Sequence, residues 1–182
     1  MPLTITIPAK DMYDPREKRF ITFKEQTLVL EHSLISIAKW ESKWHKAYLS
    51  KEKKTEEESL DYLRCMCINQ TVNSEVFKCL DQKTINEIAE YIKNPMTATT
   101  FNHQNDKRPN RDVITNELVY FWMSNYGIPF DPCQKWHFNH LMALIEVASV
   151  KNTPPKKMKN RDILNQNLSL NAKRRAAMHS KG

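Results

Sequence analysis

Residues 30–50, LEHSLISIAKWESKWHKAYLS, decide the fold class of this 182-residue chain. Five large side chains in this stretch follow one another at steps of three and four residues, the spacing of one face of a helix. The positions concerned are Leu34, Ile37, Glu41, Trp44 and Tyr48. Ser33 stands directly before them, where a serine hydroxyl caps the first turn of a helix. The sequence therefore predicts a helix that begins after Ser33.

Short alternating segments precede this helix. Residues 3–7 alternate apolar and polar side chains, and so do residues 19–23, which is typical of strands. Asp14 and Pro15 lie between them and favour a turn. The two strands could pair as a small hairpin or form a sheet edge, and residues 27–31 could extend this β region.

Further helices are expected downstream. Thr55 and Glu58 have the spacing of a capping box, and so do Thr84 and Glu87. The proline at position 95 is expected to end the second of these helices, because the residue before a proline disfavours helical backbone.

Residues 96–110 contain two consecutive segments of different composition. Residues 96–101, MTATTF, are rich in β-branched side chains and could form a strand. Residues 102–110 contain no apolar side chain, and we expect them to form an exposed loop.

An aromatic helix is expected from Val113 to Gly127, since a glycine readily takes the left-handed conformation that ends a helix. Asp131 before Pro132 then predicts the start of another long helix, which ends near Asn152. The last two long helices would form an antiparallel helical hairpin.

These patterns together predict a mainly α-helical fold with a small N-terminal β-hairpin or strand pair. We expect a β segment at residues 1–26, packed on a compact helical body at residues 27–150, and a basic C-terminal tail at residues 151–182. The chain has only 2 glycines, which argues against a Gly-rich phosphate loop or a doubly wound nucleotide-binding fold. It also lacks the run of about eighteen apolar residues that a membrane span needs, and a secretory signal, so we expect no membrane partner.

The positive charge of the chain is concentrated at its C-terminal end. Of 28 basic and 21 acidic side chains, nine basic and one acidic lie from Lys151 onward. This segment has a net charge of +8, whereas the preceding residues have a net charge of −1. A basic segment on a neutral body attracts polyanions or acidic protein surfaces over long range. The alternative is a solvated tail that serves only solubility.

The sequence contains neither G-x-S-x-G nor His-Glu-x-x-His, two motifs that carry hydrolytic chemistry. Cys133, His137 and His140 would share one face of the expected last helix, and both residue types bind zinc. Three ligands on one helix do not complete a structural zinc site, so core packing is the favoured interpretation. We expect no enzymatic activity, no metal and no cofactor.

The four tryptophans, Trp40, Trp44, Trp122 and Trp136, all lie on expected helices. Large aromatic side chains at helical spacing usually belong to the core, but amphipathic rings are also favoured anchors of protein interfaces. Our hypothesis assigns them to partner binding, together with five basic residues of the tail. These are Lys156, Lys157, Lys173, Arg174 and Arg175.

Four strings carry a family resemblance: the opening stretch at 30–50, MTATTF (96–101), ITNELVYFWMSNYGIPFDPCQKWHFNHLMALIEV (114–147) and KNTPPKKMKNRDILNQNLSLNAKRRA (151–176). They resemble a small protein encoded in the tail-gene modules of long-tailed bacteriophages, generally treated as a tail assembly chaperone. The resemblance covers nearly the whole chain. One departure is His137-Phe138-Asn139-His140, where a leucine and an arginine usually flank the asparagine.

The resemblance implies a non-enzymatic helper that acts in the host cell cytoplasm during virion morphogenesis. Such chaperones are thought to coat the tape-measure protein and to recruit the tail-tube protein around it. They are usually helical, can self-associate as homo-oligomers, and are absent from the finished particle. Two alternatives stay open: a structural virion component with an extended basic C-terminal arm, and a nucleic-acid-binding factor, which is less favoured.

Overall fold

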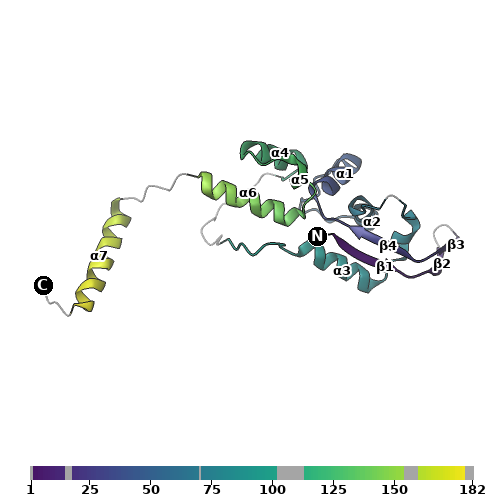
Figure 1. The fold of residues 1–182 in the computed structure, drawn as a ribbon, viewed down its shortest axis with the longest axis horizontal. Helices are drawn as coiled ribbons and strands as arrows, with labels where there is room; N and C mark the ends of the chain where they lie inside the picture. The colour runs from purple at the N-terminus through teal and green to yellow at the C-terminus, as the bar shows by residue number, and fades with distance from the viewer. Residues whose placement is uncertain (1, 15–17, 70, 102–112, 154–159, 179–182) are drawn as a thin grey trace. The chain divides into compact units, whose positions relative to one another are not determined.

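The computed structural model describes residues 2–14, 18–69, 71–101, 113–153 and 160–178. Over these residues the fold is mainly α-helical with a small β part near the N-terminus, which confirms the predicted fold class (Figure 1). The chain divides into two units, Met1–Ser149 and Val150–Gly182.

The β part consists of two antiparallel strand pairs in the described residues. Strand β1 (Leu3–Ile7) pairs with β4 (Gln26–Leu30), so that Leu3 lies opposite Leu30. Strand β2 (Lys10–Asp14) pairs with β3 (Arg19–Phe23). The pairing considered for residues 3–7 with residues 19–23 is therefore wrong.

Burial explains why β1 pairs with β4. Ile5 and Ile7 of β1 are buried, and so are Leu28 and Leu30 of β4. Two strands that each bury one face pair in the register that brings those faces to the same core. In β3, Phe23 is buried in the core, whereas Phe20, on the opposite face of the strand, is 74% exposed.

Helix α1 (Leu34–Trp44) begins where the sequence predicts. Ser33 is its N-cap, and its hydroxyl oxygen accepts a hydrogen bond from the Ser36 backbone N–H at 3.3 Å. The helix ends earlier than expected, because His45 takes a left-handed conformation with φ 52°. Tyr48 consequently lies beyond the helix, and its ring stacks on that of Tyr62 with 3.9 Å between centroids.

The backbone at the end of β4 and directly after it connects three parts of the first unit. The Ile68 N–H donates to the Val29 carbonyl at 2.9 Å, and the Glu31 N–H donates to the Met66 carbonyl at 2.9 Å. The Phe138 N–H donates to the His32 carbonyl at 2.7 Å. Residues 29–32 thus join β1, the end of the next helix and the start of a distant one.

The next helix, α2 (Glu56–Met66), confirms the predicted capping box of Thr55 and Glu58. A short 3-10 helix, η1 (Ser74–Cys79), follows it.

Helix α3 (Gln82–Lys93) begins earlier than predicted. Its N-cap is Asp81, whose carboxylate accepts a hydrogen bond from the Thr84 backbone N–H at 2.9 Å. The predicted cap at Thr84 is therefore wrong. Aspartate is at least as good an N-cap as threonine, and here it stands three residues closer to the N-terminus.

The aromatic helix α4 (Asn116–Asn125) ends as predicted, with Gly127 in the left-handed region at φ 66°. Residues 96–101 lie outside any strand, so the strand considered for them is wrong. The loop expected at residues 102–110 falls outside the described residues.

The single long helix predicted to follow Asp131 is wrong. A short helix, α5 (Phe130–Cys133), precedes α6 (Phe138–Asn152), and Asp131 has non-helical angles. The break has a tertiary cause: Ser33 forms a β-bridge with His137, which holds that residue outside a helix. In the second unit, α7 (Asn160–Ala177) occupies much of the expected tail.

Glu41 links α1 to the start of α4 from a buried position. One carboxylate oxygen accepts from the Tyr48 backbone N–H at 2.7 Å. The other accepts from the Asn116 backbone N–H at 2.8 Å and from the Asn116 side-chain amide at 2.6 Å. A carboxylate at a helix N-terminus also interacts favourably with the helix dipole, so Glu41 acts as a cap supplied by another helix.

Replacing Glu41 with glutamine is expected to lower the free energy of unfolding by about 1–3 kcal/mol, because a neutral amide cannot accept from all three donors. Urea unfolding followed by circular dichroism measures the change. Glu90→Gln, on an exposed position of α3, is the control and should stay within about 0.5 kcal/mol of the original chain. Equal stabilities of the two variants would contradict this role of Glu41.

Candidate functional site

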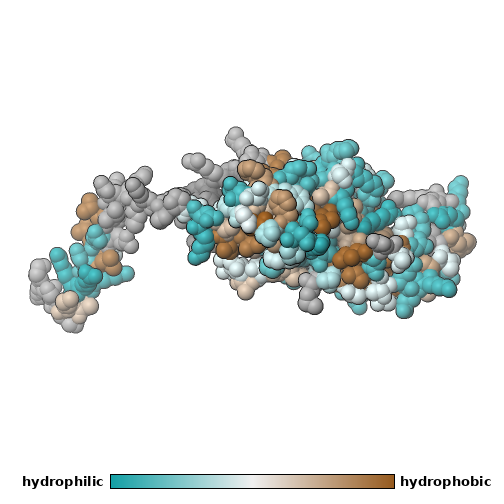
Figure 2. Space-filling model, turned by 45° about the horizontal axis from the view of Figure 1, so that its top comes forward, coloured by the Kyte–Doolittle hydropathy of each residue, from teal (hydrophilic) through white to brown (hydrophobic). Residues whose placement is uncertain are grey.

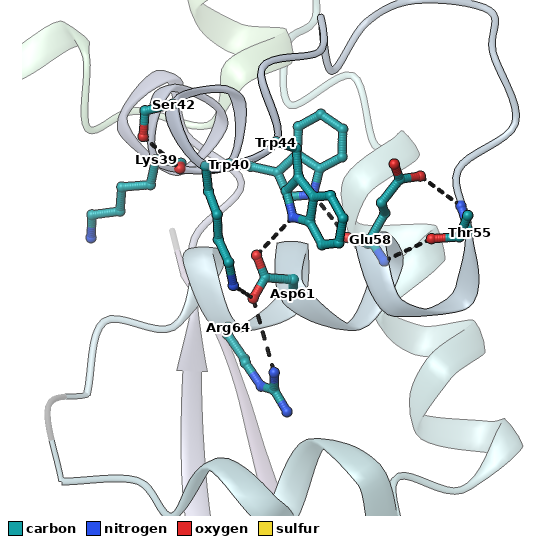
Figure 3. Close-up of polar contacts among 9 residues, drawn as sticks. Lys39, Trp40, Ser42, Trp44, Thr55, Glu58, Asp61 and Arg64 are labelled. Carbon is teal, nitrogen blue, oxygen red and sulfur yellow. Dashed lines mark hydrogen bonds and ion pairs between the residues drawn. The ribbon is translucent and has the colours of Figure 1, made fainter.

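Trp40 and Trp44 lie in the packing between α1 and α2 (Figure 3). Trp40 is 1% exposed, and its indole N–H donates to the Glu58 carbonyl at 2.8 Å. The hypothesis that Trp40 contacts a partner is therefore wrong in this fold. Trp44 is half-buried and stacks on Trp40, with 6.3 Å between ring centroids.

Two buried carboxylates of α2 hold this end of α1 in place. Asp61 accepts a hydrogen bond from the Trp44 indole N–H at 2.9 Å and forms an ion pair with Lys43 at 2.5 Å. Glu58 completes the capping box with Thr55 and pairs with Lys46 at 2.5 Å. The hydrogen bond from Lys46 lowers the pKa of Glu58. The indoles and carboxylates together serve helix packing.

The other predicted residues lie in different settings. Trp136 lies between α5 and α6, where its ring stacks on His140 with 5.1 Å between centroids. Trp122 is half-buried on α4. Of the basic residues, Lys173, Arg174 and Arg175 are exposed on α7, whereas Lys156 and Lys157 lie outside the described residues.

Trp122 lines a groove between α4, α6 and the segment 93–101. Asn139, near the start of α6, positions that segment, because its amide donates to the Ile92 carbonyl at 2.9 Å and to the Asn94 carbonyl at 2.7 Å. These two bonds satisfy carbonyl groups at the end of α3. The chain then turns at Met96, which has φ 50°, and continues along the groove.

This α4–α6 groove has a volume of about 600 Å³ and a largely apolar lining. Its apolar residues are Pro95, Phe101, Trp122, Tyr126, Met142, Ala143 and Ile145. Lys93 and Glu146 add charge to its lining. On the same helix as Trp122, Phe121 is 63% exposed. A groove of this composition suits an apolar polypeptide segment better than a polar metabolite.

A second groove of about 350 Å³ runs between α2 and α3. Its apolar residues are Leu60, Leu63, Ile85, Ile88, Ala89 and Ile92. Lys54 lies beside them, with its ammonium group 4.4 Å from the Tyr48 ring centroid. Burial lowers the pKa of Lys54. Figure 2 shows brown, hydrophobic residues interrupting the mostly hydrophilic surface of the first unit.

Titratable side chains gather in the core, where β4 meets α2, α3 and α6. His32 Nδ1 and the Tyr62 hydroxyl share a hydrogen bond of 2.5 Å, and the His32 ring contacts that of His137 with 5.1 Å between centroids. His137 Nε2 donates to the Tyr91 carbonyl at 3.1 Å, since its Nδ1 accepts from the Asn139 N–H at 3.3 Å. The Tyr91 hydroxyl donates to Glu31 at 2.7 Å.

Burial keeps this cluster in its neutral imidazole and phenol forms. It lowers the pKa of His32 to about 3, with a further contribution from the nearby His137. Burial also lowers the pKa of His137 and raises that of Tyr62 well above its usual range. Each imidazole is 3% exposed. The cluster therefore satisfies polar groups inside the core.

The zinc arrangement considered for Cys133, His137 and His140 required one continuous helix. Because α6 begins at Phe138, these residues do not share a helical face. Across the described ranges, no group of three or more His, Cys, Asp or Glu side chains is arranged to hold a metal ion.

Sequence reasoning missed most of the α4–α6 groove. One side of the groove is formed by residues 96–101, which were considered as a possible strand. Sequence periodicity does not show which part of the fold such a segment packs against. One signal was present: residues 118–122, LVYFW, are apolar around the whole helix, which indicates contacts on more than one face, and Trp122 of this run lines the groove.

No protein-family model matches the chain, and neither a curated protein nor a solved structure does so. Among the helices described here, none has the length and apolar character that crossing a bilayer requires. The interpretation of the grooves therefore depends on their geometry.

Trp44→Phe is expected to lower the free energy of unfolding by about 1.5–3 kcal/mol, because it leaves the buried Asp61 carboxylate without the indole donor. Trp136→Phe is the control, since the Trp136 ring stacks on an exposed imidazole, and should cost less than about 1 kcal/mol. Circular dichroism in urea gives both values. A Trp44 variant as stable as the control would show that this hydrogen bond does not hold the helices.

The stability of the fold is expected to decrease as the pH falls from 6.5 toward 3. In this window the unfolded chain protonates His32, whereas the folded chain does not, so each pH unit costs up to about 1.4 kcal/mol for this residue. His32→Gln should flatten the dependence between pH 6 and 4, although it lowers stability at pH 7. His45→Asn, at an exposed histidine, should leave the slope unchanged. Urea midpoints across this pH range measure it, and equal slopes in all three proteins would contradict the account.

Proposed function

We propose that the protein is a non-enzymatic assembly chaperone that binds apolar segments of a partner protein in the α4–α6 groove. The resemblance to phage tail assembly chaperones suggests the setting, which is virion morphogenesis in the host cell cytoplasm. The tape-measure protein is the proposed client, and the tail-tube protein is the subunit recruited to it.

The observation that carries this proposal is the composition of the α4–α6 groove. An indole, a phenol ring and a thioether line it together, and each is common at protein interfaces. Met142 adds adaptability, because an unbranched thioether repacks against clients of different shape. Trp122 supplies the large rigid ring that typically anchors such contacts.

The client chemistry follows from the shape of the groove. The groove lies between the helices α4 and α6 and has a largely apolar lining, so it can receive the apolar face of an amphipathic helix. A long tape-measure protein presents many such faces before the tail tube covers them. Reversible binding of several copies along it would keep these faces out of water until assembly.

The double variant Trp122→Ala/Met142→Glu tests the groove. Co-expressed with the tape-measure protein, it is expected to leave most of that protein insoluble, whereas the original chain keeps it in solution. In a pull-down with purified proteins, the apparent Kd should rise at least about tenfold, because a central aromatic anchor is lost and a charge enters an apolar site.

Ile68→Glu is the matched control, because Ile68 is 55% exposed and lies outside both grooves. It should bind the client as the original chain does. Circular dichroism must show that both variants are folded. The proposal fails if the tape-measure protein precipitates equally with and without the original chain, or if the control weakens binding as much as the groove variant.

A structural virion component is the second candidate, favoured by the exposed basic side chains of α7. Such a helix could extend into an acidic surface of a neighbouring subunit. Mass spectrometry of purified particles separates the two functions. Stoichiometric copies in the particle support the structural role, and their absence supports the chaperone.

A further inference from the structure

Strand β1 lies at the edge of its sheet. The side of β4 away from β1 is occupied, because the Val29 carbonyl accepts from the Ile68 N–H at 2.9 Å and the Val29 N–H donates to the Asn69 side chain at 2.7 Å. The N–H and C=O of one strand residue point to the same side, and those of the next residue point to the other side. Leu28 and Leu30 therefore direct their backbone groups at β1, and the far side of β1 has no strand beside it in the described residues.

The register decides which backbone groups of β1 stay unpaired. Ile5 lies opposite Leu28, so its N–H and C=O bond to β4. Its neighbours Thr4 and Thr6 consequently direct their N–H and C=O groups to the free edge. Within the described ranges, nothing else in the chain bonds to these groups. Unpaired groups on an extended backbone are complementary to one more strand.

A groove of about 460 Å³ follows this edge. Residues 4–8 line it without interruption, although alternate side chains of a strand point to opposite faces, so the groove runs along the backbone. Its other side is formed by the end of η1 and the start of α3, at Cys79, Asp81, Lys83, Thr84 and Glu87. Figure 1 shows α3 alongside β1. A strand added to β1 would lie about 4.8 Å from it, within this groove.

Helix α3 runs antiparallel to β1. Before its first residue, the pKa of Asp81 is lowered, mainly by hydrogen bonds from Thr84 and to a smaller extent by the nearby Lys10 ammonium. Because Lys10 follows the end of β1 in the chain, α3 begins near that end. In the last turn of α3, the Tyr91 hydroxyl donates to Glu31, which follows the part of β4 that pairs with the start of β1.

Two charged side chains of α3 line this groove without an ion-pair partner among the described residues. They are Lys83, toward the end of β1, and Glu87, toward its start. The remaining charged lining residues, Lys10 and Asp81, have opposite signs and lie near each other. Four residues of helix rise about 6 Å, and side chains two residues apart on a strand are about 6.6 Å apart. An acidic and a basic side chain two residues apart on a bound strand therefore match Lys83 and Glu87.

We propose that the free edge of β1 binds an extended segment of a partner protein that contains the pattern Glu-x-Lys. The segment lies antiparallel to β1, the slightly more stable direction of pairing. Its glutamate lies opposite Ile7 and beside Lys83, and its lysine lies opposite Ile5 and beside Glu87. The residue between them lies opposite Thr6 and exchanges both backbone hydrogen bonds with it. The proposal is independent of the client-binding function, which uses the α4–α6 groove.

The test is a titration of the full-length protein with two synthetic peptides, followed by the amide chemical shifts in nuclear magnetic resonance spectra. The peptides are Thr-Glu-Thr-Lys-Thr and Thr-Lys-Thr-Glu-Thr with blocked termini, since threonine favours strands. The first is expected to bind at least about fivefold more tightly, because the second places like charges together. Binding should shift the amide signals of residues 4–8 and 81–87.

The combined variant Lys83→Glu/Glu87→Lys should reverse the preference and bind Thr-Lys-Thr-Glu-Thr more tightly. Thr6→Pro removes one outward N–H, a change that an edge strand tolerates, and should weaken binding at least about fivefold. Thr6→Val is the matched control, because it keeps the N–H, and should bind as the original chain does. Circular dichroism checks that each variant is folded, and the charge exchange decides the matter if Thr6→Pro does not fold.

The proposal is overturned if neither peptide shifts residues 4–8, or if the original chain binds the two peptides equally or prefers the second. A charge exchange that leaves the preference unchanged overturns it as well. So does a folded Thr6→Pro variant that binds as tightly as Thr6→Val.

Discussion

The backbone of residues 29–33 is the constraint on which the first unit depends. Buried N–H and C=O groups must be paired, and water does not reach these groups, which lie between buried side chains such as Leu30 and Leu34. Their partners come from β1, from the end of α2 and from the residues before α6. One short segment therefore dictates where three distant parts of the chain meet.

This constraint explains both the successes and the failures of sequence reasoning. The α1 start at Ser33 and the capping box at Thr55 depend on neighbours a few residues away, and the sequence predicts both. The start of α6 depends on His137 pairing with Ser33 across the fold, which no local pattern contains. The pairing of β1 with β4 was missed for the same reason. An alternating pattern predicts a strand, but it does not predict the strand with which it pairs.

The candidate site, like the fold, could be predicted from the sequence only in part. Residue type drew attention to Trp122, which lines the α4–α6 groove, but it assigned the same role to Trp40, which is 1% exposed. The two tryptophans differ in tertiary packing. The Trp40 ring is directed into the protein, where its indole N–H donates to the buried Glu58 carbonyl. The grooves arise between elements distant in sequence, so their shape could not be predicted, and Trp122 is the one groove-lining residue among those assigned to partner binding.

The central claim is that this fold leaves the α4–α6 groove available to an apolar polypeptide while its core stays unchanged. Hydrogen–deuterium exchange of the full-length protein, alone and with the tape-measure protein, tests this directly. The account predicts slower exchange on binding in residues 95–101, 118–126 and 139–149, with residues 28–34 equally protected in both states. Unchanged exchange throughout the groove, with protection confined to other segments, would contradict it.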